Sequence, residues 1–414
     1  MLNARLTTVR RRGPRGRRLA RLLGIAGLLL AAATAASGCG STGMTDQPST
    51  SIPSATAAMT TAYPSPVPSV GSSSRPSLAA SPSAVAPPSS NVTAFFYAWY
   101  GTPDGDGAWR HWNQRAHVPP DDIASSYYPE RGPYSSRAPD VLASQMAELA
   151  QARVGVIAVS WWGIGSWEDK SLDAIFAAAS ARGIKIAFHI EPYQGQTAAS
   201  VGGDILYLLG RFGSSPALYR VSRATAGSTS TSPRPVFYLF GSSRLPVPDL
   251  TAVIHALRGT PNDSIVMVHS PKASTAVKDG ADGVYTYDSM AVPDALASLV
   301  ADCRADHVIC SPSVSPGFDN SQAVSTGVLF QDRQNGARYD SMWQAVLGAH
   351  PEWVSVTSFN EWHEGTQIEP ATDYAAGSRT YRGYAGAYGA ADQDAPDAYL
   401  NRTAYWVDQF SPGG

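Results

Sequence analysis

The sequence predicts an α/β protein in which residues 91–414 form a (β/α)8 TIM barrel. From about Asn91 onward, short apolar runs rich in β-branched residues alternate with amphipathic stretches, as buried parallel strands alternate with helices. The alternation supplies about as many strands as an eight-stranded barrel needs, over a length somewhat above the ~250 residues usual for this fold. No Gly-rich dinucleotide fingerprint follows any strand, so a doubly wound nucleotide-binding fold is the weaker alternative.

The expected strands and helices follow one another along most of this region. The strands are expected at residues 92–98, 154–161, 184–190, 235–240, 265–269, 283–287, 307–311 and 353–359. The helices are expected at residues 139–153, 169–182, 198–212, 248–257, 293–305, 339–349 and 394–410. Gly183 follows the second helix, where a C-cap is expected. The segment between the fifth and sixth strands has only a weak pattern.

The first 38 residues are expected to be a signal peptide of the lipoprotein type. An Arg-rich start precedes an apolar run at residues 22–36, which is the order of an export signal. The Ala-Ser-Gly-Cys sequence that ends at Cys39 resembles a bacterial lipobox, so Cys39 is expected to carry the lipid that anchors the protein to a membrane. The alternative is an ordinary signal peptide cleaved near Ala36. The protein is thus expected at the cell surface as an exported lipoprotein, or secreted if Cys39 is not lipidated.

Residues 39–90 are expected to be a disordered linker between the anchor and the barrel. Ser, Thr, Pro, Ala and Gly make up almost all of residues 41–90, and Asp46 and Arg75 are the only charged residues there. Such a composition cannot bury enough apolar surface to order itself. The linker would therefore hold the barrel, residues 91–414, away from the membrane.

Charge and composition exclude some partners. The net charge is −2 and only 15% of the residues are charged, so no basic surface for nucleic acid is evident. Neither a metal nor another cofactor is expected, because the calcium-like Asp104-Gly-Asp106 stretch has Arg115 where an acidic ligand would be needed. Cys303 and Cys310 either form a disulfide or remain buried free thiols. No coiled coil is apparent, which favours a monomer.

The stretch with the strongest chemical signal is Thr357–Glu369, which reads T-S-F-N-E-W-H-E-G-T-Q-I-E. It follows a β-branched run, and barrel enzymes place their chemistry at the carboxyl ends of the strands. Glu361 and Glu364 are three residues apart and would share a face if this turn were helical. Two carboxylates in unlike environments are the minimum needed to cleave a glycosidic bond. A salt-bridged helix start is the alternative for an isolated E-x-x-E.

Aromatic residues and carboxylates recur at the ends of most of the other expected strands. Together the strand-end motifs resemble the family 99 glycoside hydrolases, the endo-α-1,2-mannosidases and mannanases. The similar segments occur in the family's order at residues 96–101, 106–113, 119–123, 128–137, 159–163, 187–193, 312–319 and 358–369.

The resemblance implies a barrel enzyme that cleaves within α-mannosyl chains and retains the anomeric configuration. Most retaining enzymes use a carboxylate nucleophile with the two carboxyl groups ~5–5.5 Å apart. In this family the mannose 2-hydroxyl is understood to attack its own anomeric carbon, giving a 1,2-anhydro sugar. By match, Glu361 would be the base that removes the 2-hydroxyl proton. Glu364 would be the acid for the leaving oxygen and then the base for water, so Glu361 is expected ionised and Glu364 protonated at rest.

The resemblance also implies which residues bind substrate. These candidates are Trp99, Tyr100, Trp162, His189, Glu191, Tyr193, Tyr285, Tyr287, Asn360 and Trp362. Trp162 would line the subsite beyond the cleaved sugar, where Trp is typical of bacterial members that cut mannan. His189 could instead be a core histidine, Trp99 and Tyr100 could be core residues, and either Tyr285 or Tyr287 would face the site.

The expected substrate is an α-1,2-mannan or mannooligosaccharide. One alternative is the same fold acting on another α-mannoside of a cell-envelope glycan. The other is a barrel that binds glycans without cleaving them, which would keep the aromatic residues but would need no pair of carboxylates.

Overall fold

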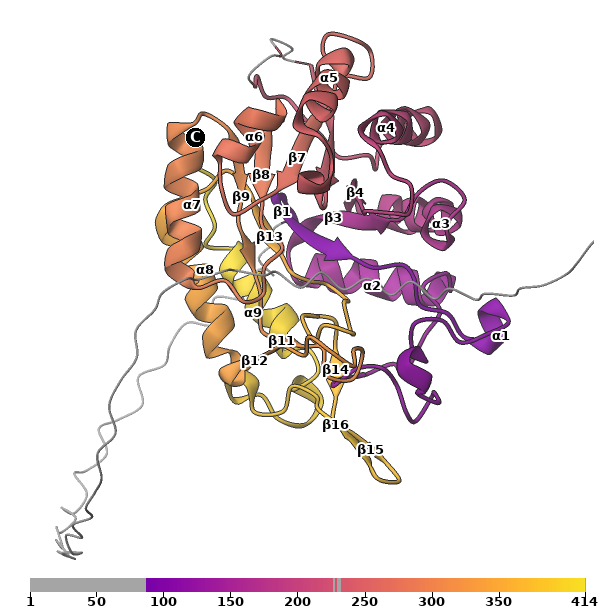
Figure 1. Ribbon diagram of the computed structural model, residues 1–414. Coiled ribbons are helices and arrows are strands. Elements are labelled where there is room, and N and C mark those ends of the chain that lie inside the picture. The colour runs from indigo at the N-terminus through magenta and orange to yellow at the C-terminus, as the bar shows by residue number, and fades with distance from the viewer. Residues whose placement is uncertain (1–86, 226–227, 229–231, 414) are drawn as a thin grey trace, which may run out of the picture. The chain divides into compact units, whose positions relative to one another are not determined.

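The computed structural model describes residues 87–225, 228 and 232–413, which lie in the second of two compact units, Ser77–Gly414 (Figure 1). The predicted signal peptide, Cys39 and the linker as far as residue 86 lie outside the described residues. The first strand begins at Ser89, two residues before the predicted start of the barrel. In the described part of the chain, no helix is long and apolar enough to cross a membrane.

The core of the structure is a closed barrel of parallel strands. Its strands are β1 (Ser89–Phe96), β3 (Val154–Trp161), β4 (Lys185–Ile190), β6 (Arg234–Leu239), β7 (Ile265–His269), β8 (Gly283–Tyr285), β9 (Ile309–Ser311), β10 (Ser313–Val314) and β13 (Val354–Val356). Successive strands are neighbours, and β13 pairs with β1 through Val92 and Val354. Because β9 pairs with β8 while β10 pairs with β13, the two segments around Pro312 act as one strand and close an eight-stranded barrel. The predicted (β/α)8 fold is confirmed.

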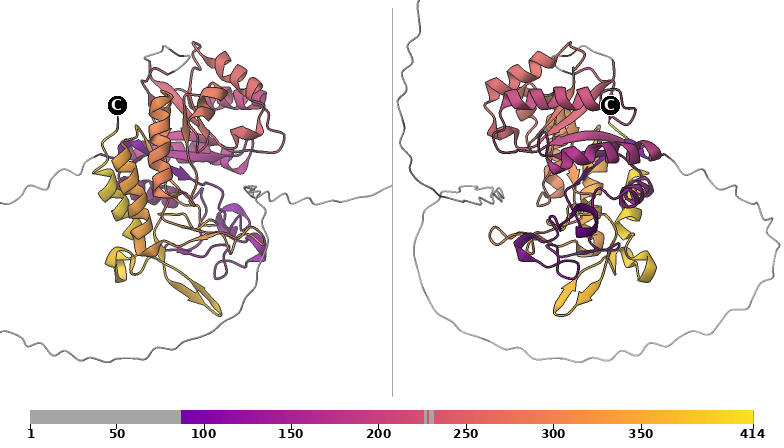
Figure 2. Two further views of the ribbon diagram at one scale, coloured as in Figure 1. Left: turned by 60° about the vertical axis from the view of Figure 1, so that its left-hand side comes forward. Right: turned by 90° about the vertical axis from the view of Figure 1, so that its right-hand side faces the viewer.

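Helices follow the strands and surround the barrel (Figures 1 and 2). These helices are α2 (Pro139–Gln151), α3 (Trp167–Arg182), α4 (Ala198–Phe212), α5 (Val247–Leu257), α6 (Ser274–Asp279), α7 (Pro293–Ala305), α8 (Ala337–Ala349) and α9 (Ala398–Val407). The predicted helices lie within a few residues of these bounds. Helix α6 falls in the weakly patterned segment, and α9 is shorter than predicted because its first turn starts only after Pro396.

The connections between the barrel strands and helices contain further short elements. They are α1 (Pro103–Asp106), β2 (Tyr128–Pro129), β5 (Arg220–Val221), β11 (Phe318–Asp319), β12 (Phe330–Gln331), β14 (Ala371–Thr372), β15 (Tyr374–Ala376), β16 (Arg379–Tyr381) and the 3-10 turns at 114–116, 242–244, 334–336, 387–389 and 392–394. The β15–β16 hairpin projects outward in orange in both views of Figure 2. Strand β2 pairs with β14, which joins the segment after β1 to the segment after β13.

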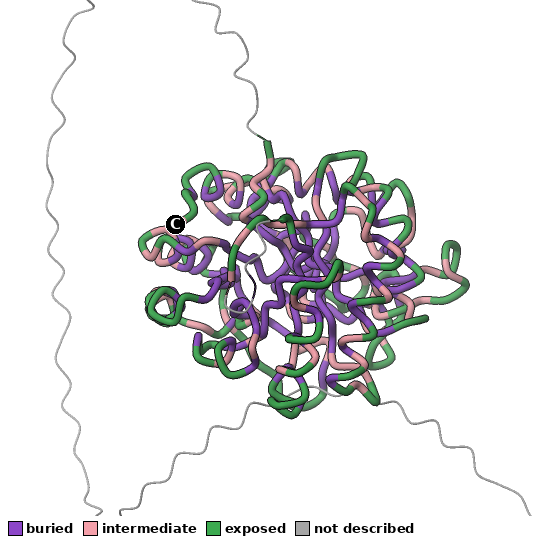
Figure 3. The backbone as a smooth tube through the Cα atoms, turned by 90° about the horizontal axis from the view of Figure 1, so that it is seen from above, coloured by how far each residue is buried: buried purple, intermediate pink, exposed green. Residues whose placement is uncertain are grey.

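Buried residues fill the centre of the barrel, while exposed residues lie mostly on the surrounding loops (Figure 3). All eight residues of β3 are buried. Gly283 has a packing role in the wall, because a side-chain carbon there would lie 2.4 Å from the carbonyl oxygen of Ile309. Cys303 and Cys310 are buried free thiols, so the disulfide alternative is wrong for this structure.

Candidate active site

The carboxylate loop, residues 357–369, extends β13 at the carboxyl end of the barrel. The regular strand ends at Val356, earlier than predicted, because the Ser358 amide donates to Thr366 within the loop (2.9 Å). The Ser358 hydroxyl accepts from the amide of Glu361 (2.8 Å), so the loop folds back on itself in successive turns and does not form a helix. Gly365 adopts a φ of +61°, which permits its close packing against the backbone of Asp319.

Glu361 is buried, and one of its carboxylate oxygens has no hydrogen-bond partner among the described residues. The residue is 2% exposed, and its Oε1 accepts from the amide of His363 (3.0 Å). The other oxygen, Oε2, has no hydrogen-bond partner among the described residues. Burial, and then the charge of Glu364, raises the pKa of Glu361 well above its usual value. Oε2 is therefore a buried acceptor whose hydrogen-bonding capacity the described residues leave unused.

Glu364 lies at the end of a chain of two tyrosines. The Tyr97 hydroxyl donates to that of Tyr287 (2.7 Å), which donates to Glu364 Oε2 (3.0 Å). Burial raises the pKa of Glu364 to about 7, although the Tyr287 hydrogen bond acts to lower it. Tyr287 is thus the tyrosine that touches the carboxylate pair.

The pKa directions of the two glutamates do not by themselves produce the predicted division of charge. The prediction is an ionised Glu361 beside a protonated Glu364, but burial raises the pKa of both carboxyl groups. Two neighbouring carboxyls in a site of low dielectric repel each other when both are ionised, which favours a single shared charge. The division of roles must therefore depend on what binds to the pair.

Glu191 is the third carboxylate of the site and is held by Ser160 and His189. Its Oε1 accepts from Ser160 (2.9 Å) and lies 2.9 Å from Nδ1 of His189. Nε2 of His189 shares a hydrogen bond with the Tyr285 hydroxyl (2.8 Å). His189 is 1% exposed and Tyr285 is fully buried, and in this structure the two side chains form one buried group with Glu191, which is 3% exposed. The core-histidine alternative fits His189.

Two partly exposed tryptophans lie beside one another at this end of the barrel. The rings of Trp99 and Trp162 are 6.3 Å apart between centroids, and Trp162 Nε1 donates to Ser160 (3.0 Å). Trp99 also stacks on His111, with centroids 4.4 Å apart. Because Ser160 also holds Glu191, this aromatic surface is joined directly to the carboxylates. Partly exposed rings of this kind suit the apolar faces of sugars.

Three of the predicted substrate-binding residues have a supporting position. Tyr100, Asn360 and Trp362 are fully buried, so no sugar can touch them in this structure. Tyr100 accepts from the Trp362 amide (3.0 Å), and Asn360 accepts from the Tyr97 amide (2.7 Å). They fix the carboxylate loop against the end of β1. Sequence alone could not separate them from contact residues, because both kinds follow a strand end.

Tyr193 lies at the edge of the site. It is partly exposed, and its hydroxyl donates to Asp204 of α4 (2.7 Å). Two residues at the site, Tyr97 and His111, were not predicted. Tyr97 alternates with Trp99 along one chain segment, so side-chain alternation could have placed it on the same side. His111 lies in a long loop, where the sequence carries no such signal.

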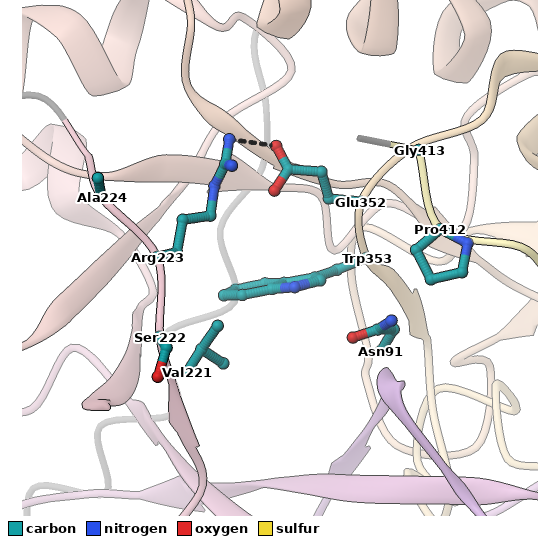
Figure 4. A pocket seen from close by; sticks show the side chains of 9 residues that line it. All are labelled: Asn91, Val221, Ser222, Arg223, Ala224, Glu352, Trp353, Pro412 and Gly413. Carbon is teal, nitrogen blue, oxygen red and sulfur yellow. Dashed lines mark hydrogen bonds and ion pairs between the residues drawn. The ribbon is translucent and has the colours of Figure 1, made fainter. Parts of the chain in front are cut away.

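Two cavities, of about 420 and 440 Å³, lie at the opposite end of the barrel. The first is lined by residues next to the starts of β1 and β13, with Trp353 below the Arg223–Glu352 ion pair (2.6 Å; Figure 4). Neither cavity includes a residue of the carboxylate loop. They are therefore separate from the chemistry at the carboxyl end.

Comparisons with known proteins agree with this geometry. The family model described as Glycosyl hydrolase family 99 matches residues 88–412. A glycoprotein endo-alpha-1,2-mannosidase-like protein from Danio rerio is 34% identical over 359 residues, covering 78% of each chain. A glycoprotein endo-alpha-1,2-mannosidase from Xenopus laevis is 32% identical, again over 78% of each chain.

A solved structure has the same barrel. The GH99 endo-alpha-mannosidase from Bacteroides thetaiotaomicron aligns with a TM-score of 0.69 and 32% identity, covering 78% of this chain and 98% of that chain. The family match spans the whole described barrel, including the carboxylate loop. The chain therefore belongs to glycosyl hydrolase family 99 and is a glycoside hydrolase.

Proposed function

We propose that the enzyme hydrolyses α-1,2-mannosidic bonds within mannan or mannooligosaccharide chains and retains the anomeric configuration. The observation that carries the proposal is the pair Glu361 and Glu364, three residues apart in one loop at the carboxyl end of the barrel, where Glu361 is buried, Glu364 is partly exposed and both pKa values are raised. The partly exposed rings of Trp99 and Trp162, which lie 6.3 Å apart at the same end of the barrel, supply a surface for neighbouring sugars. The names of the similar proteins support the linkage.

In the first step Glu361 accepts the proton of the mannose 2-hydroxyl while O2 attacks C1. The bond between C1 and the leaving sugar breaks, and Glu364 gives its proton to the leaving oxygen. The product is a 1,2-anhydro sugar and no bond forms to the protein. The axial O2 of mannose suits this step, because it can lie anti to an α-linked leaving group.

In the second step water attacks C1 and Glu364 accepts its proton. The C1–O2 bond opens, and O2 takes back the proton held by Glu361. Two inversions at C1 give net retention, and both carboxyl groups return to their starting states. Glu364 alternates between acid and base, which requires a pKa near the working pH, and its value of about 7 meets that condition.

Substrate binding can supply the division of charge between the two glutamates. Oε2 of Glu361, which has no partner among the described residues, would accept a hydrogen bond from the 2-hydroxyl, which stabilises the ionised form and lowers the pKa of Glu361. Once Glu361 holds the negative charge, repulsion between the two groups keeps Glu364 protonated. The Tyr287 hydroxyl would then support Glu364 each time it becomes ionised.

Digestion of a panel of α-1,2-, α-1,3- and α-1,6-linked mannans tests the proposal. We expect internal cleavage of α-1,2 linkages only, with the α anomer as the first product by NMR, and no products from the Glu361→Gln/Glu364→Gln double variant. Cleavage of another linkage alone would move the enzyme to a different α-mannoside. Binding without cleavage by the wild-type protein would favour a glycan-binding barrel.

We also propose that the protein is an exported lipoprotein, with residues 1–38 as signal peptide, Cys39 lipidated and residues 39–90 as linker to a monomeric barrel. The basic and apolar order of the N-terminus supports export. Mass spectrometry of the membrane-bound protein should find a lipid on Cys39, and Cys39→Ala should release the enzyme from membranes. A mature N-terminus near residue 37 without lipid would favour secretion.

A further inference from the structure

A fourth carboxylate, Glu369, lies fully buried behind the carboxylate loop and plays no part in the chemistry above. Its Oε1 accepts from Gln145 of α2 (2.8 Å) and lies 3.5 Å from Nε of Arg131. Its Oε2 accepts from the hydroxyl of Tyr134 (2.7 Å) and from Nε1 of Trp362 (2.8 Å). Donors therefore surround both oxygens, as an ionised carboxylate requires.

These bonds join Glu369 to the turn that carries the catalytic pair. Trp362 stands between Glu361 and Glu364 in the chain, and its indole is fixed by Glu369. A main-chain change at Trp362 would therefore move both carboxyl groups together. The bond to Trp362 is buried, so it is not weakened by water.

A second route leads from Glu369 to Glu364. The Tyr134 hydroxyl, which donates to Glu369, accepts from Nδ2 of Asn360 (3.2 Å). Asn360 in turn holds the backbone of Tyr97 on both sides, accepting from its amide (2.7 Å) and donating to its carbonyl (2.8 Å). The Tyr97 hydroxyl donates to the Tyr287 hydroxyl, which donates to Glu364, so the chain of hydrogen bonds ends at the second catalytic carboxylate.

The surroundings of Glu369 explain how a buried carboxylate is tolerated there. Arg131 bridges Glu369 and Glu148, a residue of α2. Burial raises the pKa of Glu369, although Arg131, Gln145 and Tyr134 act to lower it. Burying a charge costs desolvation free energy that its ion pair need not repay, so the arrangement calls for a reason beyond stability.

We propose that Glu369 is a positioning residue for the hydrolytic reaction, fixing the Glu361–Glu364 turn through Trp362 and through Tyr134 and Asn360. It does not touch the substrate. Its carboxylate sets where the two catalytic groups lie relative to the sugar between them. The inference rests on the proposed function only for the identity of the two catalytic glutamates.

The test compares Glu369→Gln, Tyr134→Phe and Trp362→Phe with Tyr339→Phe, measured on whichever α-mannoside the wild-type enzyme cleaves. Tyr339 is the matched control, because it is equally buried but its hydroxyl bonds to Thr403 away from the site (2.9 Å). A misplacement of ~1 Å can lower turnover ~10²-fold, so we expect that fall in kcat for Glu369→Gln and roughly 10-fold falls for the other two variants. KM should stay within about threefold of wild type, because binding groups remain in place.

The pH profile separates positioning from a loss of folded protein. Movement of the turn changes the distance between Glu361 and Glu364, so the two limbs of the kcat profile should move relative to each other in the three variants and not in the control. A Tyr134→Phe/Glu369→Gln double variant should lose less than the product of the single effects, because both act through one path.

Several outcomes would overturn the proposal. If Glu369→Gln does not fold, Tyr134→Phe and Trp362→Phe decide the question, since each removes one hydroxyl or N–H and keeps an aromatic ring. Variants that match Tyr339→Phe in kcat and pH profile would show that Glu369 has no positioning role. A wild-type enzyme that cleaves α-mannosides, with these variants unimpaired, overturns this inference alone; a wild type that cleaves none overturns the proposed function instead.

Discussion

The carboxylates at the two ends of the barrel differ in whether they form ion pairs with arginine. At the carboxyl end, Glu191, Glu361 and Glu364 lie together, and among the described residues no Arg or Lys forms an ion pair with them. At the amino end, Asp263 and Asp282 are each paired with both Arg234 and Arg258 at 2.8–3.3 Å. One end concentrates like charge, and the other neutralises it.

The pKa directions follow from this difference. Burial alone would raise the pKa of Asp263, but hydrogen bonds from Gly259, Ser228 and Arg258 and the charge of Arg234 hold it below the usual value. At the other end burial raises the pKa of Glu361 and Glu364, although a hydrogen bond from the His363 amide acts to lower the first and one from the Tyr287 hydroxyl acts to lower the second. The same chemical group is thus kept ionised where it ties the barrel together, and kept able to exchange a proton where chemistry occurs.

The largest expected effect separates the roles of the two glutamates at the carboxyl end. Glu361→Gln should lower kcat ~10⁴-fold on mannan and equally on an aryl α-mannoside with a good leaving group, since the 2-hydroxyl still needs a base. Glu364→Gln should lose as much on mannan but far less in the first step on the aryl substrate, which needs no acid. Burst kinetics measure that step. Equal losses for both variants on both substrates would contradict the assigned roles.

A change at the amino end should affect stability and leave chemistry intact. Arg234→Met removes one of the two arginine partners of each buried aspartate, Asp263 and Asp282. We therefore expect a loss of ~3–5 kcal/mol in the free energy of unfolding, measured by denaturant titration. Arg223→Met is the matched control at the same end, because its ion pair with Glu352 is more exposed and should be worth less than ~1 kcal/mol. Turnover per folded molecule should be unchanged in both. A fall in kcat for the folded Arg234→Met enzyme would show that the two ends are coupled.

The sequence predicted the barrel well because the signals are local. Apolar runs and amphipathic stretches define each strand and helix without reference to the rest of the chain. The strand-end rule then predicts that Glu191, Glu361 and Glu364 meet at one end of the barrel, as they do. The same rule cannot tell which polar and aromatic residues at that end face outward.

The failures share one physical cause. Asn360 and Trp362 were predicted to bind substrate, but residues 357–369 fold back and bury both behind the carboxylates. That fold depends on partners distant in sequence, among them Tyr134 and Gln145, which no local pattern connects to Glu369. For the same reason, the raised pKa of Glu361 could not be inferred from the sequence, because burial decides it.

The smallest expected effect is a shift in pH dependence that sharpens the contrast between the two ends. Glu364 must be protonated to act as acid, so kcat/KM should fall as pH rises through about 7. The Tyr287 hydroxyl stabilises the ionised form and thereby lowers this pKa, so Tyr287→Phe should move the alkaline limb to higher pH. A hydrogen bond to a charged group is worth ~1.5 kcal/mol, which corresponds to a shift of roughly one pH unit.

Tyr238→Phe is the control for this shift, because Tyr238 is a tyrosine inside the barrel whose hydroxyl bonds to Thr93 (3.3 Å) and not to a carboxylate. Its pH profile should match that of the wild type. An alkaline limb that moves to lower pH in Tyr287→Phe would mean that the group titrating there is stabilised in its neutral form by the tyrosine. That result would contradict the role of Glu364 as the acid. The lack of an Arg or Lys partner for the glutamates at the carboxyl end would then no longer explain how the acid keeps its proton.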